Sequence, residues 1–162
     1  MIGIVIVNYK EKIFWGKEYD NFVINYGGDI INLGSTKIKS IHTPGHTPGS
    51  TCYYVGNKLI AGDTLFVFGC GRCDLDGGDP EAMFETLKNL KSSLDKNTII
   101  LPGHDYSVKR ESTIEEQITG NPFMHFGDLK KFVEYKVLAP LSSNKTRDLS
   151  VSLSIEALAS FS

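Results

Sequence analysis

The chain has 162 residues, of which 41% are hydrophobic and 22% are charged, and its formal net charge is -2. This length and composition are typical of one compact globular domain of mixed character and leave no room for two full-sized domains. The acidic and basic residues are scattered rather than gathered into a basic stripe, so we expect no nucleic-acid partner.

The first part of the chain is predicted to be rich in β-strands. Short β-branched or aromatic runs, separated by glycine, predict strands at residues 2–8, 22–26, 29–33, 37–42, 51–55 and 58–61. Gly56 and Asn57 are both able to take a positive φ and predict a hairpin between the last two strands. Residues 1–7 lack the basic start and cleavage site of a signal peptide, and no apolar run reaches the roughly 20 residues of a membrane-spanning helix. We therefore expect a soluble protein with no membrane partner.

The second part is predicted to alternate helix and strand. A helix begins after Asp79, which is a good N-cap, with Pro80 at the first helical position. Its apolar residues recur at three- and four-residue spacing and predict a stripe that faces a sheet: Met83, Phe84, Leu87, Leu90 and Leu94. A buried strand at residues 98–101 ends just before His104, so this histidine is expected at the C-terminal end of a strand, where the sites of α/β proteins gather.

Two further helices are predicted before a Ser-rich end. A capping box at residues 112–115 begins the first, which ends at the Gly-Asn-Pro sequence of residues 120–122. The second covers about residues 129–137 and places four apolar residues on one face: Leu129, Phe132, Val133 and Val137. Beyond Pro140 the periodicity is lost, so we divide the chain into a domain of residues 1–140 and a weakly ordered tail of residues 141–162.

Three short loops, each after a predicted strand, carry potential metal ligands. They contain His46 within Thr-Pro-Gly-His-Thr-Pro-Gly, Asp63 after Gly62, and His104 after Gly103. Imidazole nitrogen and carboxylate oxygen bind zinc at about 2.0–2.2 Å, and tight loops at one sheet edge can hold ligands that accurately. A lone histidine or aspartate in a loop is more commonly structural, but the three in this order indicate a metal site.

These motifs resemble those of the metallo-β-lactamase superfamily, and within it the branch of the hydroxyacylglutathione hydrolases (glyoxalase II) and persulfide dioxygenases. The resemblance covers about residues 29–126. It implies an α/β fold, the C-terminal half of an αββα sandwich in which helices flank a mixed sheet. It also implies that His46 binds a first metal ion, that Asp63 bridges two ions, and that His104 binds the second.

The other metal ligands of this family come from an earlier His-x-His-x-Asp-His motif, which this sequence does not contain. Its only histidines are His42, His46, His104 and His125. In the family this motif lies some tens of residues before the GHTPG loop, a region that residues 1–32 represent here. We therefore expect either a domain that is N-terminally truncated relative to the family, through loss of a segment, a different start site or a split gene, or one whose missing half another chain supplies.

The resemblance also assigns two substrate-binding residues. Arg72 matches the basic residue that holds the glutathione part, and its fork of donors suits a carboxylate. The alternative for Arg72 is a solvated loop charge. Tyr106 matches a tyrosine that contacts the same ligand in the hydrolases. His42 and His125 are expected to be packed histidines rather than metal ligands.

The cysteines indicate the compartment and little else. Cys52, Cys70 and Cys73 are too few for a disulfide framework, which favours a reducing cytoplasm. Cys70 and Cys73 have CxxC spacing, but there is no second pair and no thioredoxin-like context, so we expect neither a zinc knuckle nor a redox site.

The activity that the resemblance implies is metal-dependent hydrolysis of a glutathione thioester, with one or two zinc ions and a small-molecule glutathione conjugate as substrate. One alternative is a persulfide dioxygenase that uses iron held by two histidines and a carboxylate. Another is a non-catalytic half-domain whose uncovered apolar sheet face pairs with a second copy or with a complementing N-terminal half. Because the ligand set is incomplete, we do not expect tight metal binding by this chain alone.

Overall fold

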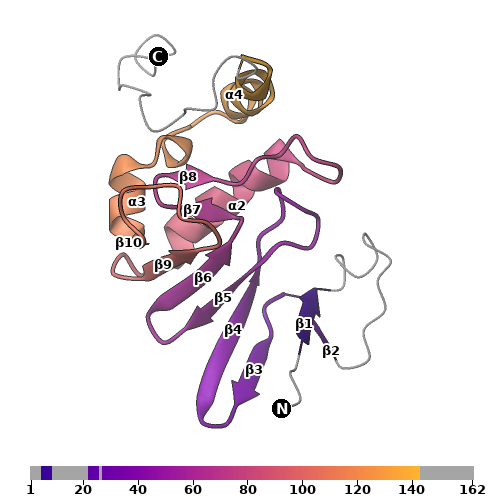
Figure 1. The fold of residues 1–162 in the computed structure, drawn as a ribbon, viewed down its shortest axis with the longest axis vertical. Helices are drawn as coiled ribbons and strands as arrows, with labels where there is room; N and C mark the ends of the chain where they lie inside the picture. The colour runs from indigo at the N-terminus through magenta and orange to yellow at the C-terminus, as the bar shows by residue number, and fades with distance from the viewer. Residues whose placement is uncertain (1–4, 9–21, 26, 143–162) are drawn as a thin grey trace.

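The structure, a computed structural model, describes residues 5–8, 22–25 and 27–142 (Figure 1). Its strands are β1 (Val5–Asn8), β2 (Phe22–Asn25), β3 (Ile30–Leu33), β4 (Thr36–His42), β5 (Thr51–Val55), β6 (Lys58–Gly62), β7 (Leu65–Phe66), β8 (Gly69–Cys70), β9 (Ile99–Pro102) and β10 (Ser112–Thr113). Its helices are α2 (Pro80–Ser93), α3 (Ile114–Gly120), α4 (Leu129–Ser142) and the short 3-10 helix η1 (Pro122–Met124). Residues 143–162 of the predicted tail, and residues 2–4 and 26 of the first two predicted strands, lie outside the described residues.

Six strands form one mixed sheet in the order β10-β9-β6-β5-β4-β3. Its neighbouring strands are antiparallel except β6 and β9, which run parallel with Gly62 opposite Pro102. Because parallel strands end at the same edge, this register brings the segments after β6 and β9 together. The predicted α/β class, a mixed sheet flanked by helices, is confirmed.

The hairpin between β5 and β6 is present, with Val55 opposite Lys58. Of the two turn residues, Gly56 takes a positive φ, of 60°, and Asn57 does not. A single glycine at the first turn position is therefore sufficient here.

One face of the sheet is covered by α2. Along β6, Leu59 and Ala61 are buried whereas Ile60 between them is 47% exposed, as expected for alternating side chains. The predicted stripe of α2 packs on the covered face: Met83, Leu87 and Leu90 are buried, and Phe84 and Leu94 are partly buried against them. Asp79 caps this helix by accepting a hydrogen bond from the Ala82 amide at 3.0 Å.

The capping box of α3 lies one residue later than predicted. Its N-cap is Thr113, whose hydroxyl accepts from the Glu116 amide while the Glu116 carboxylate accepts from the Thr113 amide. Ser112 belongs instead to β10, where it pairs with Ile100 of β9. The motif S/T-x-x-E fits both registers, and strand pairing decides between them.

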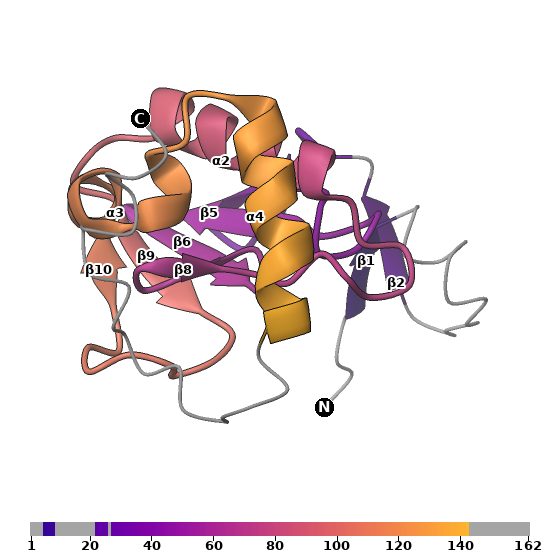
Figure 2. The same cartoon turned by 90° about the horizontal axis from the view of Figure 1, so that it is seen from above.

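The predicted apolar face of α4 is largely wrong. Phe132 is fully buried, but Leu129 and Val137 are 37% and 51% exposed, and the second buried position is Lys136. The helix also continues through Pro140 to Ser142, two residues into the predicted tail. Helix α4 packs on α2 and runs across it in the view from above (Figure 2).

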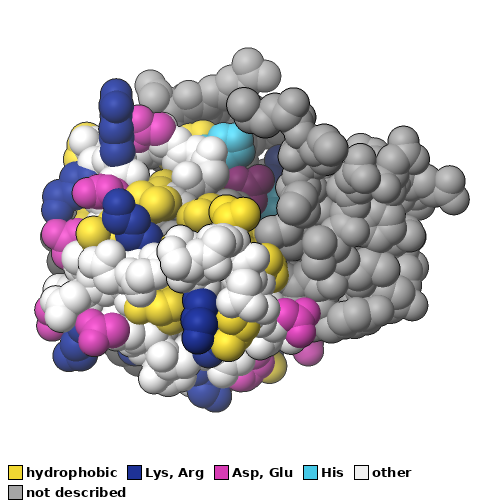
Figure 3. All heavy atoms as spheres, turned by 90° about the horizontal axis from the view of Figure 1, so that it is seen from below, with side chains coloured by type: hydrophobic (Ala, Val, Ile, Leu, Met, Phe, Trp, Pro, Cys, Tyr) yellow, Lys and Arg dark blue, Asp and Glu magenta, His cyan; other side chains and the backbone are white. Residues whose placement is uncertain are grey.

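The surface carries charges of both signs. On the face seen from below, acidic and basic side chains are interspersed with hydrophobic ones (Figure 3). Within the described part of the chain, no helix combines the length and the apolar character that crossing a membrane requires.

Candidate metal centre

The His46 loop joins β4 to β5 and is closed by its own hydrogen bonds. The Thr43 amide donates to the Ser50 carbonyl at 2.8 Å, and the Thr47 and Ser50 hydroxyls lie 2.8 Å apart. Across the loop, His42 Nε2 lies 2.9 Å from the Pro48 carbonyl oxygen. Since a carbonyl only accepts, Nε2 of His42 carries the hydrogen. The loop is thus rigid around the candidate ligand.

Helix α2 fixes the same loop from behind. Gly45 has φ of 139°, and a Cβ there would lie 2.6 Å from the backbone of Met83, so only glycine fits. The Gly45 carbonyl accepts from the Asp79 amide at 2.8 Å, and the Pro44 carbonyl accepts from the Thr86 hydroxyl at 2.7 Å. The N-cap region of α2 therefore positions His46 as well as starting the helix.

Asp63 and His104 follow the parallel strands β6 and β9. The Gly103 amide donates to the Gly62 carbonyl at 2.9 Å, which extends the pairing of the two strands into their loops. A Cβ on Gly103 would lie 2.8 Å from Asp63 Oδ1, so the glycine leaves room for the carboxylate. The prediction that His104 lies at the C-terminal end of a strand is confirmed.

The three predicted ligands converge on the carboxylate of Asp63. His46 Nε2 lies 3.6 Å from Asp63 Oδ2, and His104 Nε2 lies 3.2 Å from Asp63 Oδ1. Each histidine thus faces a different carboxylate oxygen, an arrangement that suits a bridging carboxylate between two sites better than one shared ion. Among the described residues, no group of three or more His, Cys, Asp or Glu side chains is arranged to hold a metal ion.

The donor chemistry nevertheless fits a cation beside Asp63. His46 Nδ1 lies 2.8 Å from the Arg72 carbonyl oxygen, so Nδ1 carries a hydrogen and Nε2 is the ring nitrogen that faces Asp63. A carbonyl that holds the other ring nitrogen is the usual outer-shell partner of a metal-binding histidine. His46, Asp63 and His104 are therefore the residues that would hold zinc or iron, and their role as ligands remains a prediction.

Aromatic side chains surround His104 at the rim. Tyr106 stacks on the His104 ring with centroids 5.0 Å apart and 18° between planes, and meets Phe66 edge-on at 5.2 Å. Tyr106 is 67% exposed. An exposed ring directly against a candidate ligand can contact a bound molecule, as the assignment of Tyr106 to substrate binding requires.

Arg72 is exposed and paired within its own loop. Its Nε and Nη2 donate to the two carboxylate oxygens of Asp74 at 2.7 and 2.6 Å. The Arg72 hydrogen bond lowers the pKa of Asp74, and the same bond raises the pKa of Arg72. A guanidinium has five N–H donors, so the Nη1–Nη2 edge of Arg72 is left for a second carboxylate. The substrate-binding role of Arg72 stays a prediction.

The cysteines are free and buried. Burial raises the pKa of the Cys52 and Cys70 thiols, and raises the pKa of Cys73 to about 12. Such thiols are poor nucleophiles because the thiolate is disfavoured.

The other two histidines differ from each other. His42 is partly buried and braces the His46 loop, whereas His125 is exposed, so the prediction of a packed His125 was wrong. The His125 Nε2 lies 2.8 Å from the Ile118 carbonyl oxygen. This histidine follows η1, where the helix end turns its ring toward α3 rather than into the core.

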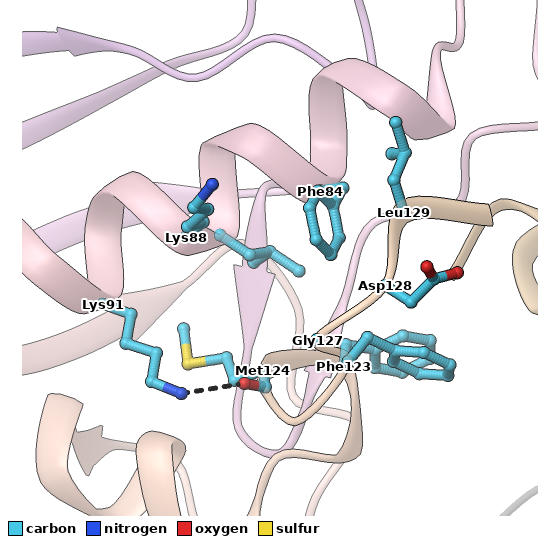
Figure 4. A pocket seen from close by; sticks show the side chains of 10 residues that line it. Phe84, Lys88, Lys91, Phe123, Met124, Gly127, Asp128 and Leu129 are labelled. Carbon is cyan, nitrogen blue, oxygen red and sulfur yellow. Dashed lines mark hydrogen bonds between the residues drawn. The ribbon is translucent and has the colours of Figure 1, made fainter. Parts of the chain in front are cut away.

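A pocket of about 340 Å³ lies between α2 and residues 123–129 and contains none of the three predicted ligands (Figure 4). Phe84 and Leu87 form its apolar wall, and Lys91 crosses it to donate to the Met124 carbonyl at 3.2 Å.

Two features of the site were missed from the sequence. One is the ion pair between Arg72 and Asp74, which the sequence indicates only weakly, by an acidic residue two positions after the arginine. The other is a buried polar contact, at 3.1 Å, between the hydroxyls of Thr43 and Thr64. It links the His46 loop to the residue after Asp63, and no local pattern predicts it because the partners are 21 residues apart.

The fold and this loop set define a known class. The chain belongs to the metallo-β-lactamase superfamily, whose family model matches residues 5–104.

Individual relatives place it near several hydrolases. It is 31% identical over 132 residues to a probable polyketide biosynthesis zinc-dependent hydrolase, PksB, of Bacillus subtilis, covering 82% of this chain and 59% of the relative. It is 33% identical over 111 residues to a hydroxyacylglutathione hydrolase of Dictyostelium discoideum, covering 62% of this chain and 41% of the relative. The chain thus spans less than two thirds of the curated relatives that it matches.

The chain is also similar to persulfide dioxygenases. A mitochondrial persulfide dioxygenase, ETHE1, of Bos taurus is 36% identical over 97 residues, covering 59% of this chain and 38% of the relative. The crystal structure of ETHE1 from Myxococcus xanthus superposes with a TM-score of 0.70 at 28% identity, covering 79% of this chain and 55% of that one. The predicted αββα-type fold is confirmed as part of the fold of these structures.

Proposed function

We propose that this chain carries the Asp63 part of the metal centre of a glutathione-thioester hydrolase. The observation that carries the proposal is the convergence of His46 Nε2 and His104 Nε2 on the two oxygens of Asp63. The likeness to the Dictyostelium hydroxyacylglutathione hydrolase supports the substrate class. Metal-dependent hydrolysis by the family gives the reaction type.

In such a site, different residues of this chain would bind the metal and the substrate. A zinc ion bound there would supply a water of lowered pKa, about 7, for hydrolysis. His46, Asp63 and His104, which follow β4, β6 and β9, would hold the cation. The free edge of the Arg72 guanidinium donates hydrogen bonds to a carboxylate of the glutathione conjugate, and Tyr106 forms the apolar rim.

The remaining ligands are proposed to come from a complementing N-terminal half, whereas a second copy of this chain lacks the same motif and could only cover the sheet. Two large hydrophobic side chains exposed on one face of the sheet support such pairing: Leu33 and Ile60 are 63% and 47% exposed, and the strand register places them on the same face. Exposed apolar patches on a sheet favour association. The mass of the particle in solution, measured with and without Zn²⁺, tests this part of the proposal.

The test of function compares metal uptake with thioester cleavage. The purified chain is saturated with Zn²⁺ and supplied with S-lactoylglutathione, in parallel with Asp63→Asn, His104→Gln and the control His125→Gln. We expect weak zinc uptake and slow hydrolysis that the first two variants abolish and the control retains. Equal zinc uptake and equal hydrolysis by the chain and Asp63→Asn would contradict the proposal.

The alternative is a persulfide dioxygenase, which the bovine relative and the Myxococcus structure favour. Loading with Fe²⁺ and supplying glutathione persulfide would then give oxygen consumption, and no thioester cleavage would accompany zinc.

A further inference from the structure

Lys136 is a buried cation whose closest contacts are not acidic, although the Asp74 carboxylate is near enough to interact with its charge. Lys136 is 8% exposed, and it lies one turn after the buried Phe132 on α4. Within the described part of the chain it forms no ion pair. Burying a charge is costly unless polar partners compensate, so the contacts of this ammonium should reveal what it does.

Three groups surround the ammonium. Lys136 Nζ donates to the Gly71 carbonyl at 2.8 Å, contacts Cys70 Sγ at 3.2 Å, and lies 4.6 Å from the centre of the Phe123 ring. Two roles are open to it: to hold a Cys70 thiolate, or to hold the backbone at Gly71. The contact with the Gly71 carbonyl, at 2.8 Å, is shorter than that with the Cys70 sulfur, at 3.2 Å, and burial raises the pKa of the Cys70 thiol, which disfavours a thiolate. The backbone contact is therefore the one that needs the cation.

Gly71 lies directly against the candidate metal centre. A Cβ at this position would be 2.0 Å from the Asp63 carbonyl oxygen and 3.0 Å from His46 Cβ, and its amide donates to the Thr64 carbonyl at 3.2 Å. The next carbonyl along the chain, that of Arg72, is the partner of His46 Nδ1 at 2.8 Å. Fixing the carbonyl of Gly71 therefore fixes the orientation of the peptide that leads to the Arg72 carbonyl.

We propose that Lys136 is a positioning residue for His46. It anchors the Gly71–Arg72 backbone so that the Arg72 carbonyl holds the hydrogen on His46 Nδ1 and leaves Nε2 facing Asp63. Helix α4 thereby controls the tautomer of a candidate ligand without touching it. This inference needs neither a bound ion nor turnover, so it stands or falls separately from the proposed function.

Histidine tautomers in the full chain test it directly. In a long-range ¹H–¹⁵N spectrum at about pH 8, above the ordinary histidine pKa of about 6.5, His46 should carry its hydrogen on Nδ1. His42 and His125 should carry theirs on Nε2, because Nε2 faces a carbonyl in each. The His46→Gln variant assigns the His46 signals.

The variants then separate positioning from folding. Lys136→Met should shift the hydrogen of His46 toward Nε2 or a mixture of both nitrogens, while His42 and His125 keep their patterns. Lys136→Arg, which retains donors, should restore the Nδ1 form. Lys130→Met, on the exposed side of the same helix, is the matched control and should change nothing.

Two results would overturn the proposal. One is an unchanged His46 pattern in folded Lys136→Met, and the other is an equal change in all the histidines, which would show a purely structural role. If Lys136→Met does not fold, Lys136→Gln, one atom shorter and displaced from the Gly71 carbonyl, is measured in its place and judged by the same two results.

Discussion

Helices α2 and α4 pack on each other, yet they bury different chemistry. The buried stripe of α2 is almost wholly apolar and faces the sheet, with Met83, Leu87 and Leu90 at its centre. Helix α4 buries Phe132 and then, one turn later, Lys136, which reaches the Cys70–Arg72 loop. A helix that covers a sheet contributes mainly buried apolar surface. A helix that contacts a functional loop also forms hydrogen bonds with the buried polar groups of that loop.

Truncating the apolar centre of each helix should give the largest effects. Phe132→Ala is expected to lower the free energy of unfolding by about 3–5 kcal/mol, and Leu87→Ala by about 2–5 kcal/mol, because each leaves a cavity. Urea unfolding measures both. Val137→Ala, at a half-exposed position of α4, is the control and should cost less than about 1 kcal/mol. A small loss for Phe132→Ala would mean that α4 is not packed as described.

The loop after β8, which Lys136 of α4 contacts, should be nearly as sensitive at one glycine. Gly71→Ala is expected to cost about 1–3 kcal/mol, because the new methyl group overlaps the Asp63 carbonyl oxygen. Gly69→Ala is the matched control: its nearest neighbour would be Phe66 Cβ at 3.7 Å, an ordinary contact. Thermal unfolding of the pair checks this, and equal midpoints would refute the close approach of Gly71 to Asp63.

Replacing the N-cap residues of α2 and α4 should lower the free energy of unfolding by smaller and similar amounts. Asp79 accepts from the Ala82 amide, and Asp128 accepts from the Lys131 amide at 2.9 Å. Replacing either aspartate with alanine should cost about 1 kcal/mol, because an amide at the helix start loses its acceptor. Asp76→Ala, in an exposed loop, serves as the control. A much larger loss for Asp79→Ala would show that holding the Gly45 carbonyl depends on the cap.

The last effect appears only at alkaline pH and is absent near neutrality. Burial raises the pKa of Cys73 from an ordinary 9.0 to about 12 in the folded chain. A raised pKa stabilises the fold below the unfolded value, and this contribution is lost as pH rises from about 9 through 12. Unfolding free energies measured between pH 8 and 11 should therefore fall less steeply in Cys73→Ala than in the original chain. Parallel slopes would contradict the burial of this thiol.

Local sequence patterns predicted most elements and the three ligand loops. The stripe of α2, its Asp79 cap, and the strand that ends before His104 each depend on residues close in the chain, so spacing and turn chemistry sufficed. The same reasoning misplaced the capping box of α3 by one residue, since two registers fit the motif and only the pairing of Ser112 with β9 excludes one.

What the amino-acid sequence determined by itself is therefore the order of strands and helices and the residue types at the ends of β4, β6 and β9. Tertiary structure alone decided that both histidines meet Asp63 and that Lys136, 65 residues from Gly71 in the chain, supports the backbone beside them. The physical reason is one of range. The spacing of apolar residues and the preferences of turn residues depend on a few neighbouring positions. Whether a charged side chain is buried, and which group hydrogen-bonds a carbonyl, depend on which distant segments the fold brings into contact.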